Sequence, residues 1–157
     1  MPSSDNPPVR VAIASDHAGL VLKEEVRAWL DRNGFELQDM GTNGLDAVDY
    51  PDFAASVARS VVSGQADFGI LVCGTGIGMA ITANKFPGIR AAVCLNEFMA
   101  KAARSHNNAN ILALGARTTA TDIALQTVEA FLKTGFEGGR HERRVAKISA
   151  IEKEALK

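Results

Sequence analysis

The chain has 157 residues, 46% of them hydrophobic, and its formal net charge is −1. This length and composition predict one globular domain with a substantial apolar core rather than a disordered chain. The nearly neutral charge argues against a large nucleic-acid-binding surface, and no apolar run reaches the length of a membrane-spanning helix.

The first eight residues differ from the rest of the chain. They are polar and rich in proline, without the basic start and apolar core of a signal peptide. We therefore expect residues 1–8 to be a flexible lead-in, residues 9–157 to form a single domain, and the protein to be cytoplasmic. The two cysteines, Cys73 and Cys94, each end a predicted strand, which does not resemble the disulfide framework of a small secreted domain.

Apolar runs of strand length alternate with amphipathic runs of helix length along the chain. The predicted strands cover residues 9–14, 35–40, 67–73, 90–94 and 111–114, and the predicted helices cover residues 18–32, 51–62, 79–86, 96–105, 119–133 and 140–156. In the first helix we expect Lys23 and Glu24 to belong to a charged face opposite an apolar one. The alternation predicts an α/β fold, a Rossmann-like three-layer α/β/α sandwich around a five-stranded parallel sheet.

Ligands bind to such sheets at the carboxyl ends of the strands, where the strand order reverses. If the order begins with strands two, one and three, the turns after the first and third strands border the same crevice. Those turns contain Asp16 and His17 in the first case and Cys73 to Gly78 in the second. The sequence therefore predicts a functional site at this edge of the sheet.

The turn after the third strand holds a cysteine followed by three alternating glycines, Gly74, Gly76 and Gly78. Glycines at this spacing let backbone N–H groups approach a ligand closely, and the start of the following helix adds partial positive charge. Cys73 is therefore a candidate reactive thiol beside a cradle for an anion or oxyanion, and a buried structural cysteine is the alternative interpretation. Cys94 has no such neighbourhood and is interpreted as structural.

The same glycines also suggest a dinucleotide fingerprint, but the match is poor. The spacing is G-x-G-x-G, Met79 occupies the position of the last glycine, and the motif follows the third strand rather than the first. Glu97 lies about where a ribose-binding acid would fall, so a nucleotide-binding regulatory module stays open as an alternative. The chain has no Gly-Lys-Ser/Thr triplet, which excludes the P-loop nucleotidases.

The three histidines are further candidates. His17 follows Asp16, and the pair is as compatible with a cap on the following helix as with catalysis. His106 closes a predicted helix, and His141 is expected to be an exposed residue at the start of the last helix. Their spacing is not that of metal ligands, so no metal site is expected.

Two arginines of the last predicted helix, Arg140 and Arg144, are four residues apart and therefore share one face. A charged face of this kind is usually a solvated surface. Because the pair follows Gly138 and Gly139, it is also compatible with a fork that binds a phosphate.

Taken together, several short motifs resemble the type B ribose-5-phosphate isomerases, in order, from about residue 9 to the end of the chain. The matching residues are Asp16-His17-Ala18-Gly19, Asp49-Tyr50-Pro51, Cys73-Gly74-Thr75-Gly76-Ile77-Gly78, Ala83-Asn84-Lys85, Gly88-Ile89-Arg90, His106-Asn107, Asn110 and Gly138-Gly139-Arg140-His141-Glu142-Arg143-Arg144. The same superfamily includes isomerases of allose 6-phosphate and galactose 6-phosphate. The resemblance therefore specifies the chemistry better than the substrate.

The resemblance implies that Cys73 is the base that moves a proton between two carbons of the sugar. In another branch of the family a glutamate at the position of Met79 performs this task, so the chain is similar to the cysteine type. The resemblance also implies the other roles. The enediolate would be steadied by Thr75 and by the backbone of Gly74, Gly76, Ile77 and Gly78. Asp16 would hold sugar hydroxyls, His106 would help to open the furanose ring, and Asn107 would hydrogen-bond the substrate. The phosphate would be bound by His17, Arg117, Arg140 and Arg144.

The resemblance further implies homodimers, or tetramers of dimers, with shared active sites in which His106 and the C-terminal arginines come from the neighbouring subunit. The expected reaction interconverts D-ribose 5-phosphate and D-ribulose 5-phosphate through ring opening and an enediolate, with no cofactor and no metal. An isomerase of allose, galactose or tetrose phosphate is the first alternative, and the nucleotide-binding module is the second. The expected small-molecule partner is a sugar phosphate, and neither a nucleic acid nor a membrane is expected.

Overall fold

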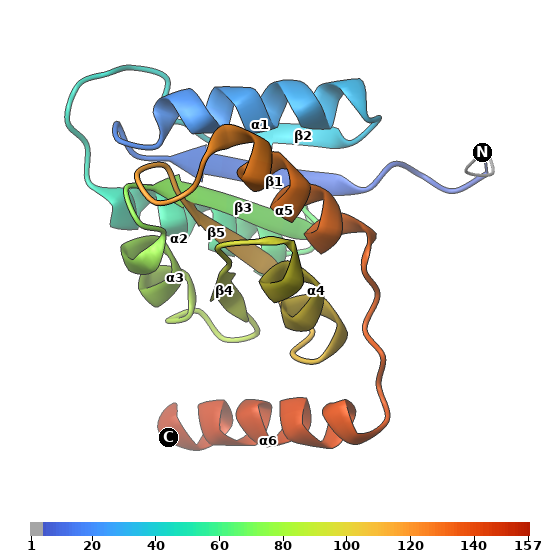
Figure 1. The fold of residues 1–157 in the computed structure, drawn as a ribbon. Helices are drawn as coiled ribbons and strands as arrows, with labels where there is room; N and C mark the ends of the chain where they lie inside the picture. Colours follow the sequence, from blue (N-terminus) through green and yellow to red (C-terminus); the bar gives the residue numbers. More distant parts are fainter. Residues whose placement is uncertain (1–4) are drawn as a thin grey trace.

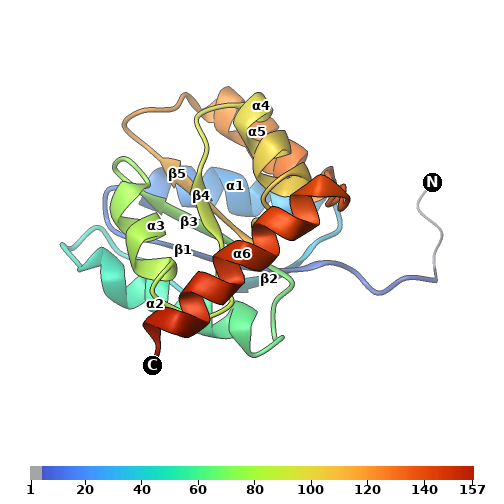
Figure 2. The ribbon, with the colours of Figure 1, turned by 90° about the horizontal axis from the view of Figure 1, so that it is seen from below.

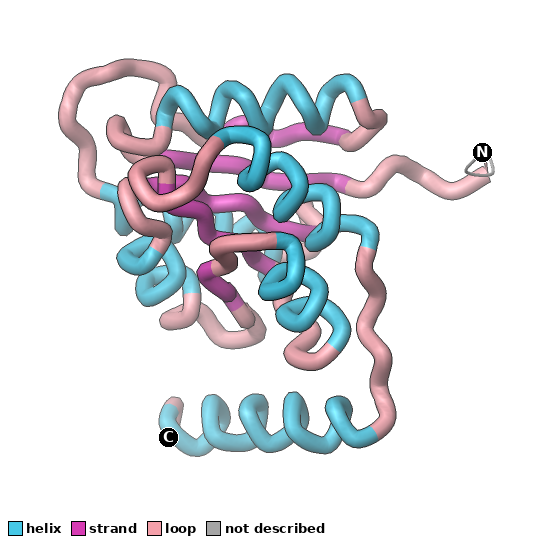
Figure 3. Tube along the Cα trace, in the orientation of Figure 1, coloured by secondary structure: helices cyan, strands magenta, loops and turns pink. Residues whose placement is uncertain are grey.

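The computed structural model describes residues 5–157, which form a five-stranded parallel sheet between layers of helices (Figures 1 and 3). The strands are β1 (Arg10–Ser15), β2 (Glu36–Asp39), β3 (Phe68–Cys73), β4 (Ala91–Val93) and β5 (Ile111–Gly115). The helices are α1 (Leu20–Arg32), α2 (Tyr50–Val62), α3 (Ile77–Ala83), α4 (Glu97–Ser105), α5 (Thr121–Lys133) and α6 (Arg140–Ala155). The strand order is β2-β1-β3-β5-β4, which confirms the predicted fold class and makes β1 and β3 neighbours.

Two hydrophobic cores attach the helices to the sheet. Helices α1, α4 and α5 cover one face around the buried side chains of Val26 and Phe131. Helices α2 and α3 cover the other face around Val57, Leu71 and Met79. The central strands β1, β3 and β5 are buried on both faces, as their continuous apolar runs predict for a parallel sheet.

Helix α6 is an exception, because it extends away from the body and faces the edge strand β4 across a groove (Figures 1 and 2). Only His141 of this helix is buried, and Ile148 and Ile151 are 48% and 66% exposed. A contact with the body comes from Glu152, whose carboxylate accepts the backbone N–H of Gly88 at 3.1 Å. An exposed apolar stripe on such a helix indicates a surface that packs against something else.

Most predicted element boundaries agree with the structure to within two residues, and the end of α3 is the main difference. This helix begins at Ile77 because Gly76, with a φ of +80°, turns the chain into it. It ends at Ala83, three residues before the predicted end, because the side chain of Asn84 pairs with the edge strand instead. The Asn84 amide donates to the carbonyl of Ala91 at 2.9 Å and accepts the N–H of Ala91 at 2.8 Å.

The predicted flexible lead-in includes residues 1–4, which lie outside the described residues. Residues 5–9, which precede β1, are exposed. Within residues 5–157, no helix combines the length and the apolar character that a membrane crossing requires.

The prediction that Lys23 belongs to an exposed charged face of α1 is wrong, because its side chain is fully buried. The ammonium lies 2.7 Å from Oδ1 of Asp39, at the end of β2, and 3.3 Å from Oδ1 of Asn43. Asp39 also accepts the backbone N–H of Gly41 at 3.0 Å. A buried charge is tolerated when it is paired in this way, so Lys23 fastens the loop after β2 to α1.

Replacing Lys23 with methionine is expected to lower the free energy of unfolding by about 3–5 kcal/mol, because the largely buried Asp39 carboxylate loses its nearest and only buried cationic partner among residues 5–157. The matched control is Arg27→Met on the same helix. Arg27 lies 3.6 Å from the other oxygen of Asp39, but its side chain is 49% exposed. The control should therefore lose less than about 1 kcal/mol. Urea unfolding followed by circular dichroism measures both, and equal losses would contradict the prediction.

Candidate active site

The cysteine at the carboxyl end of β3 lies against the turn that leads into α3. Cys73 is 5% exposed, and its Sγ accepts the backbone N–H of Gly76 at 3.1 Å. A Cβ at Gly76 would lie 3.1 Å from the backbone of Leu114, so the turn requires glycine here. Thr75 and Ile77 are exposed on the outside of the turn, and the Thr75 hydroxyl accepts the N–H of Ile77 at 3.3 Å. An N–H directed at sulfur stabilises negative charge on it, as a thiol acting as a base requires.

The two flanking glycines leave room for side chains from other elements. A Cβ on Gly74 would lie 3.3 Å from a guanidinium nitrogen of Arg117, and a Cβ on Gly78 would lie 2.6 Å from the ring of Tyr50. The backbone N–H of Arg117 also donates to the carbonyl of Gly74 at 2.9 Å. The turn is therefore lined by the cation of Arg117 and by the ring of Tyr50. The sequence predicted no role for Tyr50, although this residue lies in the Asp49-Tyr50-Pro51 motif.

The turn after β1 is joined to the same edge of the sheet. The N–H of Asp16 donates to the carbonyl of Val72 at 3.2 Å, and the buried Asp16 carboxylate accepts the N–H of Gly19 at 3.0 Å. Asp16 therefore accepts a backbone N–H at the entry to α1, as the capping interpretation predicted, although the helix itself begins at Leu20 and its N-cap residue, Gly19, makes no side-chain cap. Nδ1 of His17 accepts the N–H of Val48 at 3.2 Å, which places the proton of a neutral ring on Nε2.

We refer to the residues at this edge as the carboxyl-edge cluster. It consists of Asp16, His17, Tyr50, Cys73, Gly74, Thr75, Gly76, Ile77, Gly78 and Arg117. The cluster combines a thiol, backbone N–H donors, a carboxylate and a cation. These groups are suited to proton transfer beside a developing oxyanion on an anionic substrate.

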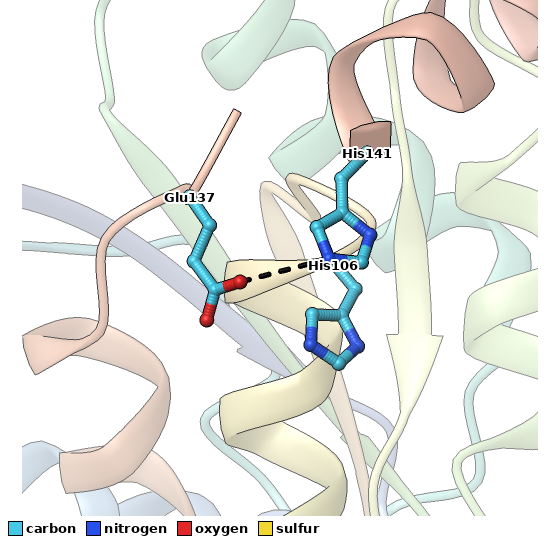
Figure 4. Close-up of side chains that lie close together, drawn as sticks. All are labelled: His106, Glu137 and His141. Atoms are coloured by element: carbon cyan, nitrogen blue, oxygen red, sulfur yellow. Dashed lines mark ion pairs between the residues drawn. The ribbon is translucent and has the colours of Figure 1, made fainter. Parts of the chain in front are cut away.

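A second group of candidate residues gathers where α4 ends and α6 begins (Figure 4). The rings of His106 and His141 are stacked, with their centroids 4.2 Å apart, and Nε2 of His141 lies 3.6 Å from Oε2 of Glu137. We call this group the amino-edge cluster, consisting of His106, Asn107, Glu137, Arg140, His141 and Arg144. The ligand atoms of His106, Glu137 and His141 all lie within 4.8 Å of one another, so the fold assembles a possible metal-binding set that the sequence spacing did not reveal.

His141 is buried, with 7% of its surface exposed, which contradicts the prediction of an exposed residue at the start of the helix. Burial lowers the pKa of its imidazole, and the neighbouring His106, Arg140 and Arg144 lower it further, whereas the carboxylate of Glu137 opposes the shift. The ring of His141 is therefore neutral near pH 7.

The two clusters lie at opposite ends of the sheet, although the sequence places residues of both in one active site. Cys73 pairs in register with Gly115 at the carboxyl end of β5, whereas His106 precedes Ile111, the first residue of that strand. The register from Gly69 to Cys73 alone spans about 13 Å at 3.3 Å per residue. In Figure 1, α3 marks the carboxyl edge, on the left, and the connection from α5 to α6 marks the amino edge, on the right. One copy of the chain therefore does not bring Cys73 and His106 into contact.

Cys94 differs from Cys73 in its surroundings. It is 1% exposed, and burial raises the pKa of its thiol to about 11. Both cysteines are free. A thiol that stays protonated at neutral pH is unreactive, which agrees with the structural interpretation of Cys94.

The chain is similar to known proteins over nearly its whole length. The ribose/galactose isomerase family matches residues 11–148. Ribose-5-phosphate isomerase B of Escherichia coli is 46% identical over 143 residues, which cover 91% of this chain and 96% of that protein. The structure of Clostridium thermocellum ribose-5-phosphate isomerase B has a TM-score of 0.93 at 53% identity, covering 94% of this chain and 99% of that one. Ribose-5-phosphate isomerase B from Mycoplasma genitalium, solved with bound ribulose-5-phosphate, has a TM-score of 0.90 at 45% identity, covering 95% of this chain and 99% of that one.

Proposed function

The chain belongs to the ribose/galactose isomerase family, and on this premise we propose that it interconverts D-ribose 5-phosphate and D-ribulose 5-phosphate. The observation that carries the proposal is the sulfur of Cys73 beside the N–H of Gly76, at the carboxyl edge where ligands bind to parallel sheets. The bound ribulose-5-phosphate in the Mycoplasma genitalium structure supports the choice of sugar. We assign the whole activity to one domain of residues 9–157.

The reaction begins from the open-chain aldose and needs a base for the hydrogen on carbon 2. We assign this role to the thiolate of Cys73. It removes the proton from carbon 2 while the aldehyde oxygen gains negative charge, and this gives the enediolate. The proton then returns to carbon 1, and a proton moves from the carbon 2 hydroxyl to the carbon 1 oxygen. Carbon 2 becomes the ketone of ribulose 5-phosphate, so that the hydrogen count is unchanged.

The negative charge of the enediolate needs donors that are already in place. We assign this role to Thr75 and to the backbone N–H groups from Gly74 to Gly78, of which that of Gly76 donates to the sulfur of Cys73. Preorganised donors of this kind are worth about 3–4 kcal/mol each to the transition state. The carboxylate of Asp16, on the adjacent turn, would hold the sugar hydroxyls.

The phosphate would supply binding energy at a distance from the reacting carbons. At the carboxyl edge, Arg117 lies over Gly74, and His17 has an Nε2–H free to donate because Val48 occupies its Nδ1. Arg140 and Arg144 would complete the phosphate site from the amino-edge cluster, which requires that a second copy of the chain bring them there.

We propose a homodimer, alone or as the unit of a tetramer, in which each active site combines the carboxyl-edge cluster of one subunit with the amino-edge cluster of the other. In this arrangement His106 opens the furanose ring and Asn107 binds the substrate. The exposed apolar residues support such an interface, since Phe98 on α4 is 80% exposed and Ile151 on α6 is 66% exposed.

The proposed reaction moves a hydrogen within one molecule, so it requires no external redox cofactor, and the N–H donors supply the polarisation that a metal ion would otherwise give. We further propose that the enzyme is cytoplasmic, because a free catalytic thiol stays reduced in that compartment.

A panel of aldose phosphates tests the choice of substrate. We expect kcat/KM for ribose 5-phosphate to exceed that for allose 6-phosphate, galactose 6-phosphate and erythrose 4-phosphate by about 10–200-fold, since one additional or missing carbon changes pocket binding by this much. The interconversion is measured by the appearance of the ketose. A higher value for a six-carbon or four-carbon sugar would reassign the substrate within the family, and tight binding of NAD or AMP without isomerase activity would favour the nucleotide-binding module.

A further inference from the structure

We propose that His106, Glu137 and His141 form a binding site for a divalent transition-metal ion such as Zn²⁺, and that the bound ion inhibits the isomerase. The binding part of the proposal stands on the geometry of the amino-edge cluster alone. The inhibitory part rests on the proposed function, because it takes His106 as the residue that opens the sugar ring.

The donor set is the first argument for this site. Two imidazoles and one carboxylate are typical ligands of zinc, and such a set leaves a further coordination position for water. The ligand atoms of the three residues lie within 4.8 Å of one another, and Nε2 of His141 is already 3.6 Å from the carboxylate of Glu137. Ligands of a tetrahedral zinc ion are about 3.3 Å apart, so the side chains need to approach one another by about 1.5 Å at most.

The backbone holds the three residues together without fixing all of the side chains. The N–H of Glu137 donates to the carbonyl of Ser105 at 3.1 Å, which joins the segment before α6 to the end of α4. Positive φ angles at Gly138 and Gly139 then reverse the chain, and His141 follows within one turn.

The stacked arrangement of the two rings has a definite consequence for binding. Parallel imidazoles direct their lone pairs side by side rather than toward a common point, so one ring must turn to bind the same ion. His106 is the ring able to turn, because it is exposed and makes no side-chain hydrogen bond among residues 5–157, where its ring stacks on His141. His141 and Glu137 would provide the preformed part of the site (Figure 4).

The charges around the cluster predict which ions bind and how tightly. Arg140 and Arg144 oppose a cation, and Glu137 is the carboxylate that offsets them at the site. Ions bound mainly through charge, such as Mg²⁺ and Ca²⁺, are therefore disfavoured, whereas Zn²⁺, Ni²⁺ and Co²⁺ gain from the two imidazoles. We expect micromolar affinity for Zn²⁺ and no measurable binding of Mg²⁺.

Isothermal titration calorimetry of the full chain with Zn²⁺, without substrate, tests the site. One ion per chain is expected, and Glu137→Gln and His141→Asn should each weaken binding by at least the about 10–100-fold that loss of an outer-sphere partner costs, because each removes a ligand. Glu142→Gln is the matched control, because Glu142 is an exposed carboxylate in the same first turn of α6. Unchanged binding in Glu137→Gln and His141→Asn would overturn the proposal. Loss of binding in Cys73→Ser, with retention in His141→Asn, would also overturn it by placing the ion at the thiol.

The inhibitory part has a separate readout. Zn²⁺ should inhibit the isomerisation of ribose 5-phosphate, and the concentration for half-inhibition should rise at least tenfold in Glu137→Gln, in step with the calorimetric affinity. A four-carbon aldose phosphate cannot close a furanose ring, since its terminal oxygen carries the phosphate, so its turnover should be far less sensitive. Equal inhibition with both sugars would overturn the role of His106 in the inhibition, whereas the calorimetry would still decide whether the site exists.

Discussion

Replacing Cys73 with serine is expected to reduce kcat for ribose 5-phosphate isomerisation by about 10³–10⁴-fold, near the upper end of what a positioned base contributes. The serine hydroxyl fits the same space beneath the N–H of Gly76 but does not ionise near neutral pH, so the proton on carbon 2 has no acceptor. Binding of ribulose 5-phosphate should change little, because the phosphate and hydroxyl partners are untouched. Steady-state kinetics together with calorimetric binding of the ketose measure the two effects separately.

A matched control for this variant is Cys94→Ala. Cys94 is buried in the other core with a pKa of about 11, so its loss should weaken the fold and leave kcat near that of the wild type. Exchange of solvent deuterium into the sugar gives a second measurement, because it requires only the enediolate. Rapid exchange in Cys73→Ser would show that another group is the base, even if net turnover were low.

The fold and the carboxyl-edge cluster were accessible from the sequence because local physics determines them. Continuous apolar runs identify buried parallel strands, and the glycines after Cys73 are required where Arg117, Tyr50 and the backbone of Leu114 approach the turn. Once β1 and β3 are neighbours, the turns that follow them must lie at the same edge. Strand order and spacing therefore placed the turns with Asp16 and Cys73 at one edge, whereas Arg117 was expected there only from the family resemblance and Tyr50 was not expected at all.

Other features depend on contacts between distant segments, which spacing does not encode. Lys23 lies on the buried stripe of α1 with Val26 and Leu30, and only the position of Asp39 after β2 explains how a lysine is accommodated there. His141 was predicted to be exposed because it begins a polar helix. Its burial arises from the stacking on His106, 35 residues earlier in the chain.

The separation of the two clusters leads to a second large expected effect, which is recovery of activity when two inactive variants are combined in one dimer. In the proposed homodimer, Cys73→Ser impairs the carboxyl-edge cluster and His106→Asn impairs the amino-edge cluster. A heterodimer of the two variants has one site with both lesions and one site with neither. A purified heterodimer, obtained by coexpression with two different tags, should therefore show about half of the wild-type kcat per dimer, although each parent is nearly inactive.

The control for this recovery is a heterodimer of Cys73→Ser with Asp16→Asn. Both residues belong to the carboxyl-edge cluster, so each site of this heterodimer carries one lesion and activity should stay near that of the parents. Cys73 and His106 of one chain cannot form a single site by themselves, because they lie toward opposite ends of the sheet. The distance along β3 from Gly69 to Cys73 is already about 13 Å, which exceeds the reach of any hydrogen bond. If the heterodimer of Cys73→Ser with His106→Asn is as inactive as this control, the two clusters do not meet across an interface. His106 would then have to act in some way other than on a substrate bound at Cys73.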